Sequence, residues 1–123
     1  MVIVGTKILS GDNSGARLIK VFKVIGSHKR KAAVIGDKIV GSIKLCSKKK
    51  KIKKHDVCTA LLIRQKKKYK RYTGLYISFS YNYAVLIDKK RGGPLGTRIF
   101  GPFMYELRRK KFIKFLSIAT TII

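Results

Sequence analysis

The chain has few acidic residues: 5 Asp and Glu stand against 30 Lys and Arg, which gives a formal net charge of +25 at pH 7. Self-repulsion on this scale destabilises an isolated compact monomer. The imbalance therefore predicts a polyanionic partner, which could be nucleic acid, an anionic membrane or an acidic protein. Because hydrophobic residues still make up 46% of the sequence, the chain can bury a core and is not predicted to be a disordered polycation.

Long apolar runs and presequence patterns are also missing. The apolar stretches are short and interrupted by charge, which argues against a membrane span of about 18 residues and against an amphipathic basic helix. Nucleic acid is therefore the favoured partner, and no membrane contact is expected. The N-terminal stretch MVIVGTKILSGDNSG resembles neither a signal peptide nor an Arg-rich transit peptide. We expect the protein to work in the compartment where it is made.

Cysteine is scarce as well. Cys46 and Cys58 are too few for a disulfide framework, which favours a reducing compartment. His55 lies near them in the sequence, but a zinc site needs about four ligands and no fourth candidate is close. We predict two core thiols, no metal site and no cofactor.

No catalytic constellation is recognisable. The five acidic residues are Asp12, Asp37, Asp56, Asp88 and Glu106. They are scattered, and four of them stand beside turns or strand ends, where Asp usually serves as a turn or cap residue. The glycines of GGPLGTRIFG match no nucleotide-binding loop. We interpret the protein as a binding protein, not an enzyme, and expect no small-molecule substrate.

Short β-branched runs separated by turn residues dominate residues 1–90, which predicts an all-β fold. The expected strands are Val2–Ile8, Leu18–Ile25, Lys38–Leu45, Val57–Arg64, Tyr76–Phe79 and Tyr83–Ile87. Several such strands in a small chain would leave open edges unless the sheet closes, so a small β-barrel is expected.

Two strands carry further information about burial. Alternation along Lys38–Leu45 places Ile39, Ile43 and Leu45 on the core face. Ala60–Ile63 is apolar at every position, which predicts a central strand covered on both sides.

After Pro102 the apolar spacing becomes roughly helical, so we expect one or two short helices, followed by an extended end at SIATTII.

Lysine and arginine cluster at residues 27–31, 47–55 and 64–72, each time between expected strands. Almost no acids compensate these runs, so they repel themselves unless phosphates neutralise them. We predict RNA contacts from these clusters, from Arg17 and from a C-terminal basic run. The predicted contacts are Arg17, Lys29, Arg30, Lys48, Lys49, Lys50, Lys51, Lys53, Lys54, Arg64, Lys66, Lys67, Lys68, Lys70, Arg71, Arg108, Arg109 and Lys111. The competing interpretation is a set of solvated loops without a ligand.

Tyrosines accompany the third cluster. Tyr69 and Tyr72 alternate with basic residues, and aromatic faces can stack on splayed bases, so we interpret both as RNA contacts. Tyr76, Tyr81 and Tyr83 are expected to be structural, because tyrosine on strands often packs within the sheet.

Three stretches coincide with one known family. DNSGAR at 12–17, the segment Ala60–Leu86, and GTRIFGP at 96–102 followed by ELR at 106–108 resemble the L-fourteen family of large-subunit ribosomal proteins. The resemblance runs in register from about Leu9 to Ala119. It implies a small closed five-stranded β-barrel with a projecting β-ribbon and a short C-terminal helical part. It also implies one ribosomal-protein domain over residues 1–123, with the helical part and tail from about residue 101.

The resemblance further implies a structural role at the interface between subunits. It predicts contacts with large-subunit rRNA, bridges to small-subunit rRNA, and contacts with the large-subunit proteins three and nineteen. A ribosome-silencing factor that blocks subunit joining would dock on Thr97, Arg98 and Lys114, which match by position. In that arrangement Thr97 and Arg98 face outward while Ile99 and Phe100 are buried.

Composition suggests where the protein works. Abundant Ile, Lys, Phe and Tyr with no Trp is typical of an AT-rich genome. Together with the missing presequence, this predicts an organelle-encoded protein of the mitochondrial ribosome, with the plastid or the bacterial cytoplasm as alternatives. Two rival functions stay open from the sequence: a free-standing OB-like single-stranded nucleic-acid binder or RNA chaperone, and a cationic membrane-active protein.

Overall fold

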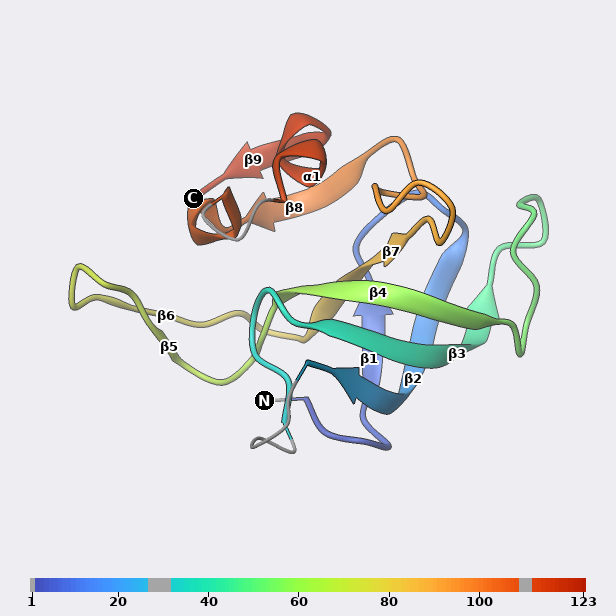
Figure 1. The fold of residues 1–123 in the computed structure, drawn as a ribbon, viewed down its shortest axis with the longest axis horizontal. Helices are drawn as coiled ribbons and strands as arrows, with labels where there is room; N and C mark the ends of the chain where they lie inside the picture. Colours follow the sequence, from blue (N-terminus) through green and yellow to red (C-terminus); the bar gives the residue numbers. More distant parts are fainter. Residues whose placement is uncertain (1, 27–31, 109–111) are drawn as a thin grey trace.

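A computed structural model describes residues 2–26, 32–108 and 112–123, and its central feature is a closed β-barrel (Figure 1). The barrel strands are β1 (Lys7–Ser10), β2 (Ala16–Ile25), β3 (Lys38–Cys46), β4 (Val57–Arg64) and β7 (Tyr83–Ile87). Neighbouring strands pair antiparallel, except that β1 and β7 close the barrel in parallel. The predicted all-β fold with a five-stranded barrel is confirmed.

Two further parts are attached to the barrel. Strands β5 (Tyr69–Lys70) and β6 (Tyr76–Ile77) form a two-stranded ribbon that projects away from it (Figure 1). The C-terminal part pairs β8 (Ile99–Phe103) with β9 (Ala119–Ile122) in parallel, and between them lie the 3-10 helix η1 (Tyr105–Arg108) and helix α1 (Ile113–Ser117). The ribbon and the short helical part agree with what the family resemblance implies.

Strands β4 and β7 are buried on both faces and therefore separate two hydrophobic cores. In β4, Ala60 and Leu62 point into the barrel interior, while Leu61 and Ile63 belong to a second cluster shared with the C-terminal part. The members of the second cluster from the C-terminal part include Ile99, Phe103, Met104, Leu107 and Phe115. The prediction that Ala60–Ile63 is covered on both sides is confirmed, and the C-terminal part is one of the two covers.

Several element boundaries differ from the sequence prediction. The first strand begins at Lys7, because residues 3–6 form a tight turn in which the backbone N–H of Thr6 donates to the carbonyl of Ile3. Val2 instead forms an isolated bridge with Ala33. Strands β5 and β8 were not predicted, and β6 ends at Ile77 rather than Phe79. These elements are short: β5 and β6 pair with each other as a hairpin of two-residue strands, and β8 depends on its distant partner β9.

Two side chains expected to be buried are exposed. Leu45 is 54% exposed, because the β2–β3 pairing shifts register around Leu18, the residue opposite it, and such bulges redirect side chains. Phe100 is 49% exposed, because alternation along β8 turns Ile99 inward and its neighbour outward. The expectation that Phe100 is buried with Ile99 is therefore wrong for Phe100 and right for Ile99.

Gly41 marks the closest approach of β2 and β3. A β-carbon at this position would lie 2.6 Å from the carbonyl oxygen of Lys20 and 2.7 Å from Cγ2 of Ile19. We expect Gly41→Ala to lower the free energy of unfolding by about 1–3 kcal/mol, because the two strands cannot separate without disturbing the barrel. Denaturant titration of the full chain measures this, with Ser42→Ala as the neighbouring control that should stay within about 0.5 kcal/mol. Equal stability of both variants would contradict the close packing.

Candidate nucleic-acid interface

The β3–β4 loop carries the densest group of exposed cations. The side chains of Lys48, Lys49, Lys50, Lys51, Lys53 and Lys54 are all exposed. The loop backbone is nevertheless fixed, because the N–H of Ser47 donates to the carbonyl of Gly15 at 2.7 Å and the N–H of Lys53 donates to Oδ2 of Asp56 at 3.0 Å. The structure therefore holds a run of positive charge in a defined place at one end of the barrel (Figure 1).

The ribbon carries the second group of cations. Lys66, Lys67, Lys68 and Lys70 are exposed beside Tyr72, which is 72% exposed. Tyr69, interpreted from sequence as an RNA contact, is instead half-buried and packs against the second core cluster.

Two of the tyrosines expected to be structural are exposed. Tyr76 is 63% exposed, because the two-stranded ribbon has no second layer to cover it, and Tyr81, in the bend before β7, is 60% exposed. Tyr83 is partly buried and packs, as expected. The exposed aromatic surface of the ribbon is thus larger than the sequence predicted.

Arg64, at the end of β4, lies inside the molecule rather than with these lysines. It is 8% exposed, its Cζ stands 3.9 Å from the centre of the Tyr83 ring, and its Nη2 donates to the carbonyl of Phe100 at 2.8 Å. Burial lowers the pKa of Arg64 from its ordinary value. A β-carbon on Gly101 would lie within van der Waals overlap of the guanidinium, so this glycine leaves the space that Arg64 fills. Arg64 joins the barrel to β8.

Arg71 also has a partner within the chain. Its Nε lies 2.7 Å from Oε1 of Glu106, and its Nη2 donates to Oε2 of Glu106 and to the backbone oxygen of Ile123, the latter at 2.7 Å. These contacts tie the turn end of the ribbon, where Arg71 follows β5, to the C-terminal part.

The remaining predicted cations lie at separate places. Arg17 is exposed near the start of β2, and Arg108 is exposed at the end of η1, where Nη1 donates to the hydroxyl of Tyr105 at 3.3 Å. Lys29, Arg30, Arg109 and Lys111 lie outside the described residues.

All five carboxylates are used within the chain. Those of Asp12, Asp37, Asp56 and Asp88 accept backbone N–H groups, and that of Glu106 pairs with Arg71. Among the residues that the structure describes, Arg71–Glu106 is the one ion pair. The exposed lysines of the β3–β4 loop and the ribbon therefore have no carboxylate partner in the described chain.

Two of the three stretches that carried the family resemblance, DNSGAR and GTRIFGP, lie against each other. Oδ1 of Asn13 accepts the backbone N–H groups of Thr97 and Arg98 at 2.8 and 3.1 Å, and its Nδ2 donates to Oγ1 of Thr97 at 2.8 Å. A β-carbon on Gly96 would lie 2.7 Å from the same Oδ1, so glycine is required for this approach. We call this set of contacts the Asn13 clamp. It was not foreseen from the sequence, where Asn13 reads only as a turn residue.

The Asn13 clamp fixes the backbone of the predicted protein-docking residues and leaves their side chains outside. Thr97 and Arg98 are both exposed, as expected. Lys114, on α1, is exposed too, and its Cδ lies 3.4 Å from the position that a β-carbon on Gly93 would take. Lys114 therefore borders the segment 88–98, whose last residues the clamp holds.

Sequence reasoning missed the cations of that segment. Lys89, Lys90 and Arg91 are exposed just after β7. The sequence does show three consecutive basic residues before Gly92-Gly93. This run is shorter than the three clusters at 27–31, 47–55 and 64–72.

In the segments 2–26, 32–108 and 112–123, no group of three or more His, Cys, Asp or Glu side chains could hold a metal ion. No helix in these segments is long and apolar enough to cross a membrane. Cys58 is buried and Cys46 is partly buried against the barrel core, and both are free thiols.

Comparison with known families gives one match. The family model described as ribosomal protein L14p/L23e matches residues 1–123, the entire sequence. The resemblance read from DNSGAR and GTRIFGP is therefore confirmed, and the match also covers the ribbon and the C-terminal part. This family is made up of structural proteins of the ribosome, not enzymes.

The Asn13 clamp can be tested by hydrogen exchange. We expect Asn13→Ala to speed amide exchange at Thr97 and Arg98 roughly five- to tenfold, because each amide loses a hydrogen bond worth about 1 kcal/mol. Asn13→Asp is the control, since its carboxylate keeps an accepting oxygen for both amides while the Nδ2 donor is replaced by a charged acceptor. It should leave both amides protected. Wild-type exchange rates in Asn13→Ala would show that the clamp does not hold this segment.

Proposed function

The chain belongs to the ribosomal protein L14p/L23e family, and from this membership we propose that it fastens separate segments of rRNA and presents a surface at the interface between the ribosomal subunits. It is a structural protein of the large ribosomal subunit that binds rRNA and other ribosomal proteins. The observation that carries the proposal is the placement of the β3–β4 loop and ribbon lysines, which are exposed and have no carboxylate partner in the described chain.

The proposed mechanism is electrostatic and geometric. The barrel holds the β3–β4 loop at one end and the ribbon at the other side, so their lysines can neutralise phosphates of different rRNA segments (Figure 1). If eight phosphates are contacted, the binding constant falls with roughly the seventh power of the salt concentration on duplex RNA, from a slope of about 0.9 per contact. Sequence preference would come mainly from the shape of the rRNA.

The protein-docking part of the proposal concerns Thr97, Arg98 and Lys114. They border one rigid segment that the Asn13 clamp fixes, and Arg98 is the one charged residue between Gly92 and Phe103. A ribosome-silencing factor would dock here and block subunit joining. Bridges to small-subunit rRNA and contacts with the large-subunit proteins three and nineteen complete the proposed set of partners. Composition favours a mitochondrial ribosome over a plastid or bacterial one.

Sedimentation tests the proposal as a whole. A tagged copy, expressed in its own compartment, is followed through a gradient in about half-molar monovalent salt, where purely charge-driven contacts weaken steeply. We expect co-migration with large subunits and with joined ribosomes. A chain found at the top of the gradient, or spread over all RNA, would favour the free-standing single-stranded nucleic-acid binder, to which the exposed ribbon tyrosines are also suited.

Arg98→Glu tests the docking surface. Because the clamp engages the backbone of Arg98 and not its side chain, the unfolding free energy should change by no more than about 0.5 kcal/mol. Binding of the silencing factor, measured by pull-down on purified large subunits, should be lost. Lys7→Glu, an exposed residue of β1 with the same change of charge, serves as the control and should leave docking intact. If Arg98→Glu unfolds the chain, Arg98 is structural and the docking assignment fails.

A further inference from the structure

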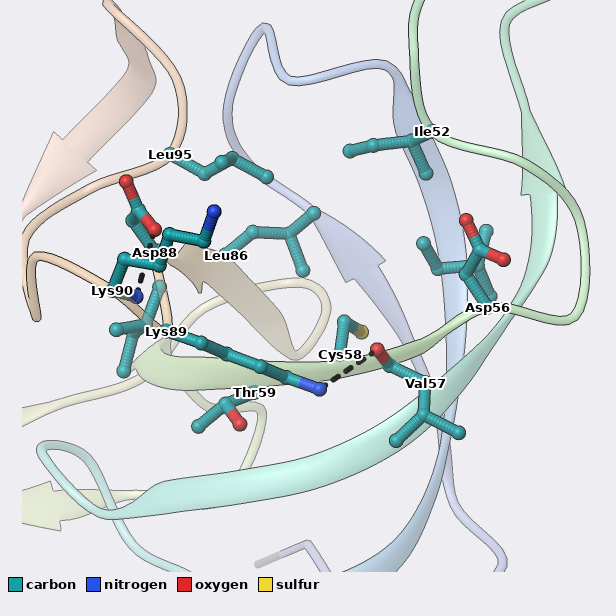
Figure 2. Close-up of a pocket in the computed structure, with 12 residues that line it drawn as sticks. Ile52, Asp56, Val57, Cys58, Thr59, Leu86, Asp88, Lys89, Lys90 and Leu95 are labelled. Carbon is teal, nitrogen blue, oxygen red and sulfur yellow. Dashed lines mark hydrogen bonds between the residues drawn. The ribbon is translucent and has the colours of Figure 1, made fainter.

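An apolar hollow of about 290 Å³ opens beside β4, between the β3–β4 loop and the segment after β7 (Figure 2). Its apolar lining comes from Ile43, Ile52, Val57, Leu86, Ile87 and Leu95. The volume stands at the lower end of the roughly 300–1,000 Å³ that small-molecule sites occupy, so it suits one ring system rather than an extended ligand.

The charged groups that line this hollow have almost no net charge. Burial raises the pKa of the Cys58 thiol to about 11, so it stays protonated, and it donates to the carbonyl of Gly41 at 3.5 Å. The carboxylates of Asp56 and Asp88 already accept backbone N–H groups. Lys89 lies along β4 with its Nζ 3.4 Å from the carbonyl of Val57, as Figure 2 shows. The hollow therefore offers an apolar interior with hydrogen-bonding groups at its edge.

A second hollow, of about 450 Å³, adjoins the first. Both are lined by Ile52 and Leu95, which stand at their common boundary. The second hollow is lined further by Asn13, Ser14, Lys50, Lys51, Gly96 and Thr97. Its lining carries two lysines and no carboxylate, whereas the lining of the first has two lysines and two carboxylates. An apolar site and a cationic site side by side match the base and the phosphate of one nucleotide.

We propose that the apolar hollow binds a single unstacked nucleobase of the rRNA, while the adjoining phosphates contact Lys50 and Lys51 on one side and Lys90 on the other. This inference rests on the proposed rRNA-binding function and assigns it a base-binding site. RNA is favoured over an apolar side chain of a neighbouring protein because lysines flank the hollow on both sides, in the β3–β4 loop and in the segment Lys89–Arg91. Bases splayed out of loops are also the parts of RNA that proteins most readily bind.

A substitution that fills the hollow without changing the charge of the chain should abolish base binding and leave the phosphate contacts in place. Leu95 lines both hollows, is 46% exposed and points toward the apolar hollow in Figure 2, so Leu95→Trp places an indole there. Val4→Trp is the matched control, since Val4 is 60% exposed in the N-terminal turn and lines neither hollow. Large subunits assembled with each chain are treated with base-modifying reagents. We expect one unpaired nucleotide to be protected by the wild-type and Val4→Trp chains and to become reactive with Leu95→Trp.

The outcomes distinguish the two levels of the proposal. If no variant or wild-type chain co-migrates with large subunits, the proposed function itself fails. If the chains co-migrate but no nucleotide changes its reactivity in Leu95→Trp, only the base-binding site is overturned.

A diazirine analogue of leucine at position 95 gives a second measurement that does not depend on the tryptophan variant entering subunits. Leu95 is 46% exposed at the boundary of the two hollows. Irradiation of assembled subunits should link it to an rRNA nucleotide. A covalent adduct to a neighbouring protein, or none at all, would overturn the inference.

Discussion

Scarcity of carboxylates governs how this chain uses its charge. Five acids face thirty bases, and each acid is bound within the chain: four accept backbone N–H groups at turns, and Glu106 pairs with Arg71. None of them neutralises a lysine of the β3–β4 loop or the ribbon. The fold therefore places its lysines at fixed positions while leaving their charge to an external polyanion, which is what a protein assembled into rRNA requires.

Local pattern predicted most of the barrel, and contacts between distant residues account for what it missed. Strands β4 and β7 have the bounds expected from their apolar runs, and the two-sided burial of β4 followed from its composition. The end of the chain was expected to be extended, but its parallel pairing with β8 could not be foreseen, because Gly101-Pro102 interrupts the strand pattern of β8. The exposure of Leu45 depends on a register shift set by the opposite strand. Periodicity describes one strand at a time and contains no information on register.

The sequence predicted the candidate site as a set of basic residues. It did not distinguish the basic residues that stabilise the fold from those that face outward. Arg64 and Arg71 belong to the same basic run as Lys66–Lys70, yet both bond to groups 35 or more residues away in the sequence. Arginine suits these joints because its planar group can bond two acceptors or stack on a ring while it donates elsewhere. Lysine, a compact charge on a flexible stem, occupies the exposed loop and ribbon positions. In this basic run, arginine therefore marks the residues that stabilise the fold and lysine marks those that face outward. Position within the run does not distinguish the two.

The Asn13 clamp connects the two proposed binding surfaces. Asn13 lines the cationic hollow and also fixes the backbone of Thr97 and Arg98. Both surfaces are therefore ordered by hydrogen bonds within the chain before any partner arrives. A partner that meets a preformed surface does not lose free energy in ordering it. The neutral, glycine-rich segment that follows the basic run Lys89–Arg91 serves this purpose: a β-carbon on Gly96 would overlap Oδ1 of Asn13, so glycine at this position lets the clamp close.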